Sequence, residues 1–210
     1  MPTRIKVCGI TLLEDALLAV ELGADALGFN FYRPSPRYIA PDAARVIIQR
    51  LPPFVVPVGV YANETDMGHV AAVAAEAGVS AIQLHGPQLP EPAGPPAGYS
   101  LIRAVAVGEG FKAESLAALQ ANAFLLDAFH PQLSGGTGNQ FDWELARDAN
   151  RYGAIILAGG LNPDNVGRAI RGVRPYAVDL ASGVESAPGQ KDPALLRAFF
   201  AAVQEADRNL

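Results

Sequence analysis

Short apolar runs alternate with segments of helical spacing along the whole chain, and this alternation restricts the possible folds more than any other feature. The apolar runs predict eight strands, over residues 4–8, 25–31, 54–61, 80–85, 99–107, 123–127, 153–158 and 176–180. The helical spacing predicts helices over residues 12–22, 41–50, 65–77, 113–122, 142–150, 162–171 and 193–207. A regular alternation of this kind is typical of α/β proteins with a parallel sheet.

Eight such strands favour closure into a single (β/α)8 TIM barrel over a doubly wound open sheet. The predicted strands are short and apolar, and none has the character of an edge strand. A length of 210 residues is near the lower limit for this barrel, and a hydrophobic content of 50% supplies a sizeable core. We therefore expect residues 1–210 to form one barrel domain.

Two segments depart from the regular alternation. Residues 87–96 contain five prolines, which interrupt helical hydrogen bonding, so we expect a short or distorted fourth helix there. The loop from Phe129 to Gln140 is long and rich in glycine, which suits a mobile functional segment better than a plain connection. The residues that predict a lid in this loop are Gly135, Gly136, Thr137 and Gly138.

Charge and composition argue against several classes of function. The net charge is -5 and no basic run is present, so we expect no nucleic-acid partner. No apolar run approaches the roughly 20 residues of a membrane helix, and neither a signal-peptide layout nor a possible internal disulfide is present, so we expect a soluble cytoplasmic protein. One cysteine and three scattered histidines do not support a metal site, and no dinucleotide or Walker-type fingerprint appears.

The stretch from Ile155 to Glu185 predicts a phosphate site. It contains two apolar strand ends that each open into a glycine turn, first at Gly159 and Gly160 and then at Ser182 and Gly183. Glycines let a ligand oxygen approach main-chain amides, and the start of a helix adds partial positive charge. Two such turns late in a strand–helix chain match the phosphate site after strands seven and eight of a barrel. One Gly-Gly turn alone is equally compatible with ordinary loop geometry.

In a barrel, side chains at the carboxyl ends of the strands face the active site. The polar residues that we expect at this rim are Cys8, Arg37, Gln83, His85, Arg103, Asp127 and Asp179. A thiol at Cys8 can act as a nucleophile or a base, although a buried inert cysteine is the alternative. A carboxyl at Asp127, after an apolar run, suits a general acid but can also cap a loop. Arg37 suits a carboxylate ligand or a surface salt bridge.

Seven short motifs in register resemble phosphoribosylanthranilate isomerase of tryptophan biosynthesis. They are Lys6-Val7-Cys8-Gly9-Ile10-Thr11, Ser35-Pro36-Arg37-Tyr38, Gln83-Leu84-His85-Gly86, Leu126-Asp127, Gly135-Gly136-Thr137-Gly138 with Phe141-Asp142-Trp143, Leu157-Ala158-Gly159-Gly160-Leu161 and Ser182-Gly183-Val184-Glu185. The motifs run in family order from one end of the chain to the other. One departure is Ala181-Ser182, where the family commonly has Ser-Ser, and residues 87–96 also fit the family only loosely.

This resemblance implies a barrel enzyme that catalyses an Amadori rearrangement without a cofactor. Cys8 matches the general base of the family, Asp127 its general acid, and Arg37 the residue that binds the anthranilate carboxylate. The two glycine turns match the phosphate site, and we expect Gln83, His85 and Asp179 to contact substrate as well. The implied partner is the small molecule phosphoribosylanthranilate, and either a monomer or a homodimer is compatible with the sequence.

Two other functions remain open at this point. A different isomerase or lyase barrel could act on another sugar phosphate, and a sensor could bind a phosphate ligand without catalysis. Cys8 and Asp127 at the same rim distinguish these functions. A sensor has no need of an acid and a thiol, and the related aldose isomerase barrels of histidine biosynthesis use a pair of aspartates instead.

Overall fold

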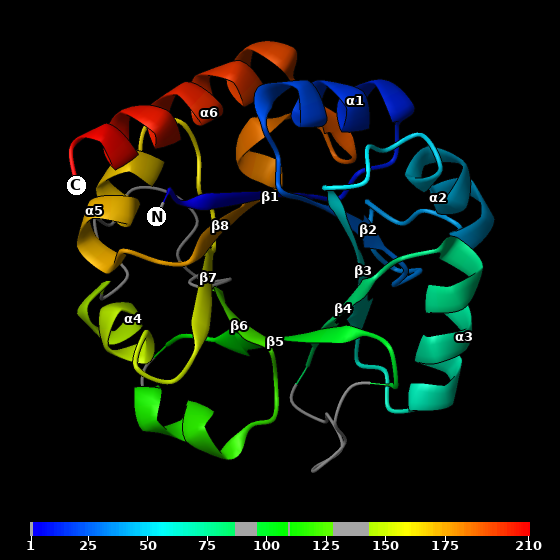
Figure 1. Cartoon of the computed structure of the whole chain (residues 1–210), viewed down its shortest axis with the longest axis horizontal. Coiled ribbons are helices and arrows are strands. Elements are labelled where there is room, and N and C mark those ends of the chain that lie inside the picture. Colours follow the sequence, from blue (N-terminus) through cyan, green and yellow to red (C-terminus); the bar gives the residue numbers. More distant parts are fainter. Residues whose placement is uncertain (1, 87–95, 109, 128–142) are drawn as a thin grey trace.

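The protein is a closed barrel of eight parallel strands inside a ring of helices (Figure 1). The structure, a computed structural model, describes residues 2–86, 96–108, 110–127 and 143–210. Each strand pairs with its neighbours in sequence, and β1 closes the ring by pairing with β8. The strands are β1 (Arg4–Cys8), β2 (Ala26–Asn30), β3 (Val56–Ala62), β4 (Ala81–His85), β5 (Ser100–Ala106), β6 (Ala123–Asp127), β7 (Ala154–Ala158) and β8 (Ala177–Leu180). The predicted TIM barrel is therefore confirmed.

Helices cover the outer face of the sheet in the described residues. They are α1 (Leu13–Leu22), α2 (Pro41–Ile48), α3 (Met67–Ala77), α4 (Trp143–Ala149), α5 (Val166–Val173) and α6 (Pro193–Arg208). None of these helices has the length and apolar character that crossing a membrane requires. Residues 87–95 and the predicted lid of Phe129 to Gln140, with Gly135, Gly136, Thr137 and Gly138, lie outside the described residues.

The prediction of an α-helix over residues 113–122 was wrong. A shorter 3-10 helix, η1 (Ala113–Ala118), occupies this place, and Leu119 is already extended. The reason lies in Asn122, whose backbone N–H donates to the Leu101 carbonyl while its side-chain oxygen accepts from the Leu101 N–H, both at 2.8 Å. These two bonds bind Asn122 to β5 and leave too little chain for another helical turn.

Two apolar cores follow from the alternation of side chains along the strands. One lies between the sheet and the helices and contains large residues such as Phe29, Leu126 and Phe199. The other lies inside the barrel and consists of smaller side chains, which are Val58, Ala81, Ile102, Ala123, Leu125, Ile156, Ala158 and Ala177. These side chains fill the interior of the barrel, which is therefore a packed core and not a pore.

A short hairpin after β8 was not expected from the sequence. The 3-10 helix η2 (Ser182–Val184) leads into β9 (Glu185–Ala187), which pairs antiparallel with β10 (Gln190–Lys191). The Lys191 backbone N–H donates to the Asp15 carboxylate on α1 at 2.8 Å, and this bond fixes the hairpin against the first helix. The hairpin thereby brings the side chains of Glu185 and Lys191 to the C-terminal end of the barrel.

Candidate active site

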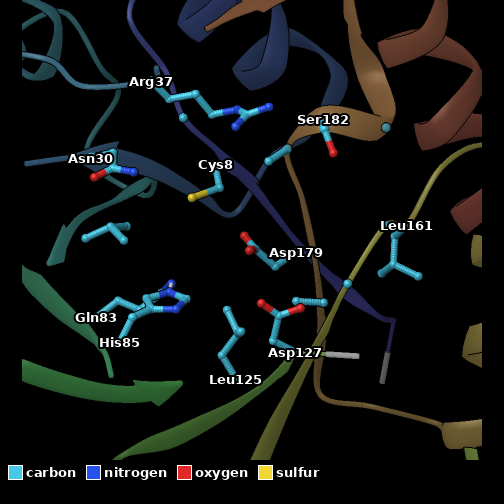
Figure 2. A pocket seen from close by; sticks show the side chains of 17 residues that line it. Cys8, Asn30, Arg37, Gln83, His85, Leu125, Asp127, Leu161, Asp179 and Ser182 are labelled. Atoms are coloured by element: carbon cyan, nitrogen blue, oxygen red, sulfur yellow. Dashed lines mark hydrogen bonds between the residues drawn. The ribbon is translucent and has the colours of Figure 1, made fainter. Parts of the chain in front are cut away.

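A cavity of about 320 Å3 opens at the carboxyl ends of the strands (Figure 2). It gathers side chains from both ends of the sequence, because barrel closure places β1 next to β8. All ten predicted catalytic and substrate-binding residues line it, namely Cys8, Arg37, Gln83, His85, Asp127, Gly159, Gly160, Asp179, Ser182 and Gly183. Asn30, Val60, Leu125, Leu161 and Ala181 line it as well and were not predicted.

The first glycine turn lies between β7 and α5. Gly159 and Gly160 have φ values of 92° and 68°, a conformation that residues with a β-carbon rarely adopt. The Asn165 side chain holds the turn closed, since its nitrogen donates to the Gly160 carbonyl at 3.0 Å and its oxygen accepts from the Asn162 N–H at 2.8 Å. The helix begins only at Val166, four residues later than predicted, because Asn162 and Asn165 build this turn instead.

The second glycine turn packs directly on the first. A β-carbon at Gly183 would lie 2.0 Å from the carbonyl oxygen of Leu161, so no larger residue fits at this position without moving the main chain. Ser182 begins the short helix η2, and Figure 2 shows it on the same side of the cavity as Leu161. The two turns therefore present adjacent main-chain segments to the cavity, as an anion site requires.

Cys8 ends β1 and lies beside an ion pair. Lys6 Nζ lies 2.7 Å from Asp179 Oδ1, and the two residues are partners in the β1–β8 register. Burial raises the pKa of the Cys8 thiol; the ammonium of Lys6 opposes this rise and the carboxylate of Asp179 adds to it. Burial also disfavours the charged form of Lys6, but Asp179 and Cys8 outweigh it and raise the pKa of the ammonium. Lys6 is therefore cationic beside a mostly neutral thiol.

Arg37 is held by a second buried ionic group. Its Nε and Nη2 donate to the two oxygens of Glu185 at 2.6 to 3.0 Å, in a fork that fixes the guanidinium plane. Lys191 Nζ, on a fully buried side chain, donates to the same carboxylate at 2.8 Å and to the Cys8 carbonyl at 2.6 Å. Burial favours the neutral acid, but Arg37 and Lys191 together lower the pKa of Glu185. Glu185 thus stays ionised and orients Arg37.

Gln83 and His85 supply polar groups from β4. The amide nitrogen of Gln83 lies 2.6 Å from His85 Nε2, a hydrogen bond whose donor depends on the imidazole tautomer. Burial, with Lys6 next, lowers the pKa of His85, so the ring is neutral at neutral pH. The Gln83 Oε1 atom is buried and has no hydrogen-bond partner among the described residues. Both side chains can therefore form hydrogen bonds with hydroxyl groups of a ligand.

Asp127 ends β6 and points into the cavity that Cys8 also lines (Figure 2). The two side chains reach it from different strands, so an acid and a thiol can act on different atoms of one ligand. Within the part of the chain that the structure describes, no group of three or more His, Cys, Asp or Glu side chains could hold a metal ion.

The prediction that Arg103 lies at the rim was wrong. Arg103 lies in the middle of β5, is 4% exposed, and does not line the cavity. Its register partners, Leu84 and Phe124, belong to the core between sheet and helices, whereas its neighbour Ile102 points inside the barrel. The alternation of side chains along a strand therefore directs Arg103 away from the active site.

Besides the unpredicted lining residues, three ionic side chains that surround the cavity were missed in the sequence, namely Lys6, Glu185 and Lys191. Lys6 could have been found, because it precedes Cys8 by two positions and so shares its face of the strand. Glu185 lies within a recognised motif, but no local pattern pairs it with Arg37, which is 148 residues away. Lys191 reaches the site only through the unexpected hairpin.

Proteins of one enzyme family resemble this chain over nearly its whole length. The family model described as N-(5′phosphoribosyl)anthranilate (PRA) isomerase matches residues 5–202. The N-(5′-phosphoribosyl)anthranilate isomerase of Citrifermentans bemidjiense is 51% identical over 205 residues, which cover 95% of this chain and 96% of that protein.

Solved structures show the same likeness. The phosphoribosyl anthranilate isomerase of Thermus thermophilus superposes with a TM-score of 0.83 at 40% identity, covering 97% of this chain and 99% of that one. A phosphoribosyl anthranilate isomerase in complex with reduced 1-(o-carboxyphenylamino)-1-deoxyribulose 5-phosphate gives a TM-score of 0.79 at 39% identity, with the same coverage. That relative therefore binds a ligand with a carboxylate at one end and a phosphate at the other.

Proposed function

Because the chain belongs to the N-(5′-phosphoribosyl)anthranilate isomerase family of enzymes, we propose that it converts N-(5-phosphoribosyl)anthranilate into 1-(2-carboxyphenylamino)-1-deoxyribulose 5-phosphate in tryptophan biosynthesis. One observation carries the proposal. A thiol, a carboxyl, a clamped arginine and two glycine turns line a single cavity of about 320 Å3. A substrate with two anionic ends and a reactive sugar between them fits this arrangement.

The two anionic ends bind at separate places in this proposal. The phosphate occupies the turns at Gly159, Gly160, Ser182 and Gly183, where main-chain amides replace its water. The anthranilate carboxylate binds Arg37, whose Nη1 donates no hydrogen bond among the described residues while Nε and Nη2 are held by Glu185. Fixing both ends places the sugar ring between acid and base and removes most of its freedom before the reaction.

The first step opens the sugar ring. Asp127, in its protonated form, donates its proton to the ring oxygen, the C1–O bond breaks, and the nitrogen lone pair forms the C1=N bond of an iminium. Gln83 and the neutral His85 are placed to hold the sugar hydroxyls, because an amide oxygen without a partner is stabilised by a hydroxyl donor.

The second step moves the hydrogen from C2. The thiolate of Cys8 takes the C2 proton, the C2–H electron pair forms a C1=C2 bond, and the C1=N pair returns to nitrogen. The resulting enolamine becomes the ketone when C1 gains a proton and the hydroxyl on C2 loses one. An acid and a base on separate strands suffice for both steps, so the scheme needs no redox cofactor.

Adding purified protein to freshly prepared phosphoribosylanthranilate and following the anthranilate-type fluorescence tests the proposal directly. We expect a change at a rate proportional to enzyme concentration, and nearly none with Cys8→Ser protein at the same concentration. Binding of the substrate without any conversion would overturn the proposal in favour of a sensor. Light scattering of the same sample would decide between a monomer and a homodimer, both of which the proposal accommodates.

A further inference from the structure

We propose that Lys6 is a positioning residue that stabilises the thiolate of Cys8, and that Gly28 leaves the space in which the two side chains meet. This inference rests on the proposed role of Cys8 as the base, and it adds a reason why a thiol can serve there. Lys6 touches no substrate atom in the scheme above, so its effect passes through Cys8.

The position of Lys6 follows from the register of the barrel. Lys6 and Cys8 are two residues apart on β1, so both point into the barrel, with Lys6 one layer below the cavity. The lysine is 3% exposed, and its ammonium lies 2.7 Å from Asp179 Oδ1. An ammonium has three donors, and Asp179 takes one of them. Since Asp179 is the one carboxylate partner of Lys6 among the described residues, the ammonium has capacity for a second anion.

Gly28 shows where that second anion forms. It is the register partner of Cys8 on β2, and a β-carbon built there would lie 2.7 Å from Cys8 Sγ and 3.2 Å from Lys6 Nζ. The sulfur and the ammonium therefore border the same small space, which a side chain at this position would fill. On β2 this space is open only beside the thiol, at Gly28, because the other inward-facing residues, Ala26 and Asn30, both carry side chains.

The charged and titratable groups around Cys8 come from seven segments of the chain and include both signs. Lys6 on β1, Lys191 on β10 and Arg37 after β2 favour the thiolate, whereas Asp179 on β8 disfavours it. His85 on β4 and Asp127 on β6 line the same cavity. Glu185 on β9 faces Arg37 and Lys191 and offsets part of their charge. Among the described residues, Lys6 pairs with Asp179, whereas Arg37 and Lys191 share the carboxylate of Glu185.

This pairing explains why Lys6 can act through a whole catalytic cycle. Asp179 keeps the lysine protonated whether Cys8 is a thiolate before proton abstraction or a thiol after it. The ammonium thus supplies a constant positive charge beneath the base and does not exchange protons with it. An arrangement of this kind favours thiolate formation without requiring the substrate to be present.

Cys8 is the single cysteine of the 210 residues, so alkylation by iodoacetamide reports its thiolate directly. The experiment measures the alkylation rate of folded, ligand-free protein against pH. We expect Lys6→Met to lower the rate at neutral pH about tenfold or more, and Lys6→Arg to restore most of it. Asp179→Asn should act in the opposite direction and raise the rate about threefold or more, because it removes a negative charge and frees the ammonium for the sulfur.

The opposite signs separate thiolate stabilisation from a purely structural ion pair. If Lys6 and Asp179 only held β1 to β8, both variants would break the same pair and shift alkylation in the same direction, and that result would overturn the inference. Lys112→Met, at an exposed position in the same chain, is the matched control and should leave the rate unchanged. Should Lys6→Met not fold, the double variant Lys6→Met/Asp179→Asn leaves no buried unpaired charge and is compared with Asp179→Asn alone.

Turnover measurements keep this inference distinct from the proposed function. The alkylation rate needs no substrate, so a tenfold loss in Lys6→Met supports thiolate stabilisation whatever the enzyme catalyses. An unchanged alkylation rate in Lys6→Met, together with an inactive Cys8→Ser, overturns the role of Lys6 alone. Full turnover by Cys8→Ser overturns the base assignment and, with it, the catalytic meaning of the Lys6 contact.

Discussion

The two ends of the barrel interior are built on opposite principles. The lower layer consists of apolar side chains, which are Val58, Ala81, Ile102, Ala123, Ile156 and Ala177. The mouth carries ionic groups, among them Asp179, which pairs with Lys6 just beneath the cavity, and the Arg37–Glu185–Lys191 cluster, in which the Lys191 side chain is fully buried. Buried ion pairs contribute little net stability, whereas apolar packing contributes much. The lower layer therefore stabilises the fold, and the mouth serves chemistry at a cost in stability.

Cys8→Ser should give the largest change in rate and the smallest change in fold. A serine hydroxyl has a much higher pKa than a thiol and is a poor base at neutral pH, so we expect a rate loss toward the upper end of about 10² to 10⁴. Steady-state kinetics on folded protein, with product binding as a control, measure it. Activity within about threefold of the parent would show that the mouth uses another base.

Asp127→Asn should be severely impaired as well. Asparagine keeps the shape of the side chain but cannot deliver a proton to the ring oxygen, so a loss of about 10² to 10⁴ in rate is expected. Affinity for a stable reduced product analogue should change far less, because Arg37 and the glycine turns remain. Calorimetry beside steady-state rates tests both halves, and an affinity loss as large as the rate loss would contradict the acid role.

The sequence predicts the barrel and most of the mouth because both depend on local patterns. Strand periodicity identifies all eight strands, and position at a strand end identifies Cys8, Asp127 and Asp179. Arg103 was misplaced because a shift of one residue along a strand moves a side chain to the opposite face. Strand ends alone do not give that phase, and the neighbours Leu101, Ile102, Ala104 and Val105 do not give it either, because both faces of this strand are apolar.

The ionic groups of the mouth could not be predicted because they join distant parts of the chain. Lys6 and Asp179 are 173 residues apart and meet only when β1 closes against β8. Lys191 depends on a hairpin of five described strand residues whose sequence carries no strong alternation. The prediction of an α-helix over residues 113–122 was wrong for a similar reason, since Asn122 is hydrogen-bonded to β5. Local propensity does not include such tertiary contacts.

Glu185→Gln tests whether the mouth depends on its ionic clusters for stability. The variant removes the one carboxylate that pairs with the buried Lys191 side chain among the described residues, and it opens the fork on Arg37. Removing one partner of a buried pair costs about 3 kcal/mol in the free energy of unfolding. We also expect a higher Michaelis constant, because Arg37 loses its orientation. Denaturant unfolding measures the first effect. Glu21→Gln, on an exposed helix face, is the control and should change stability by no more than about 0.5 kcal/mol.

Ile156→Val is the corresponding test of the lower layer. Ile156 is buried inside the barrel between Leu125 and Ala177, and removing one methylene costs about 0.5 to 1.5 kcal/mol in the free energy of unfolding. The turnover number should stay that of the parent, since Ile156 does not line the cavity and contributes none of its polar groups. A clear fall in turnover at unchanged stability would contradict the division between the two layers.

The smallest expected effect is a difference in how the stability losses of Glu185→Gln and Ile156→Val depend on pH. Burial alone would raise the pKa of Glu185, but Arg37 and Lys191 lower it below the ordinary value. The folded protein therefore binds the proton of this carboxyl less tightly than the unfolded chain does, so the carboxylate stabilises the fold above the ordinary Glu pKa. That stabilisation is lost as the pH falls through the lowered pKa of the folded state.

The loss of unfolding free energy in Glu185→Gln relative to the parent should therefore be largest near neutral pH and become smaller as the solution becomes acidic. The deficit of Ile156→Val should stay constant, because no titrating group changes with it. Urea unfolding of the three proteins at intervals from neutral pH down to about pH 4 measures both, and taking differences from the parent cancels the titrating residues that do not interact with the substituted side chain. A Glu185→Gln deficit that is the same at every pH would mean that the carboxylate contributes through shape and not through charge. The ionic clusters of the mouth would then stabilise the fold in the same way as the apolar layer beneath them.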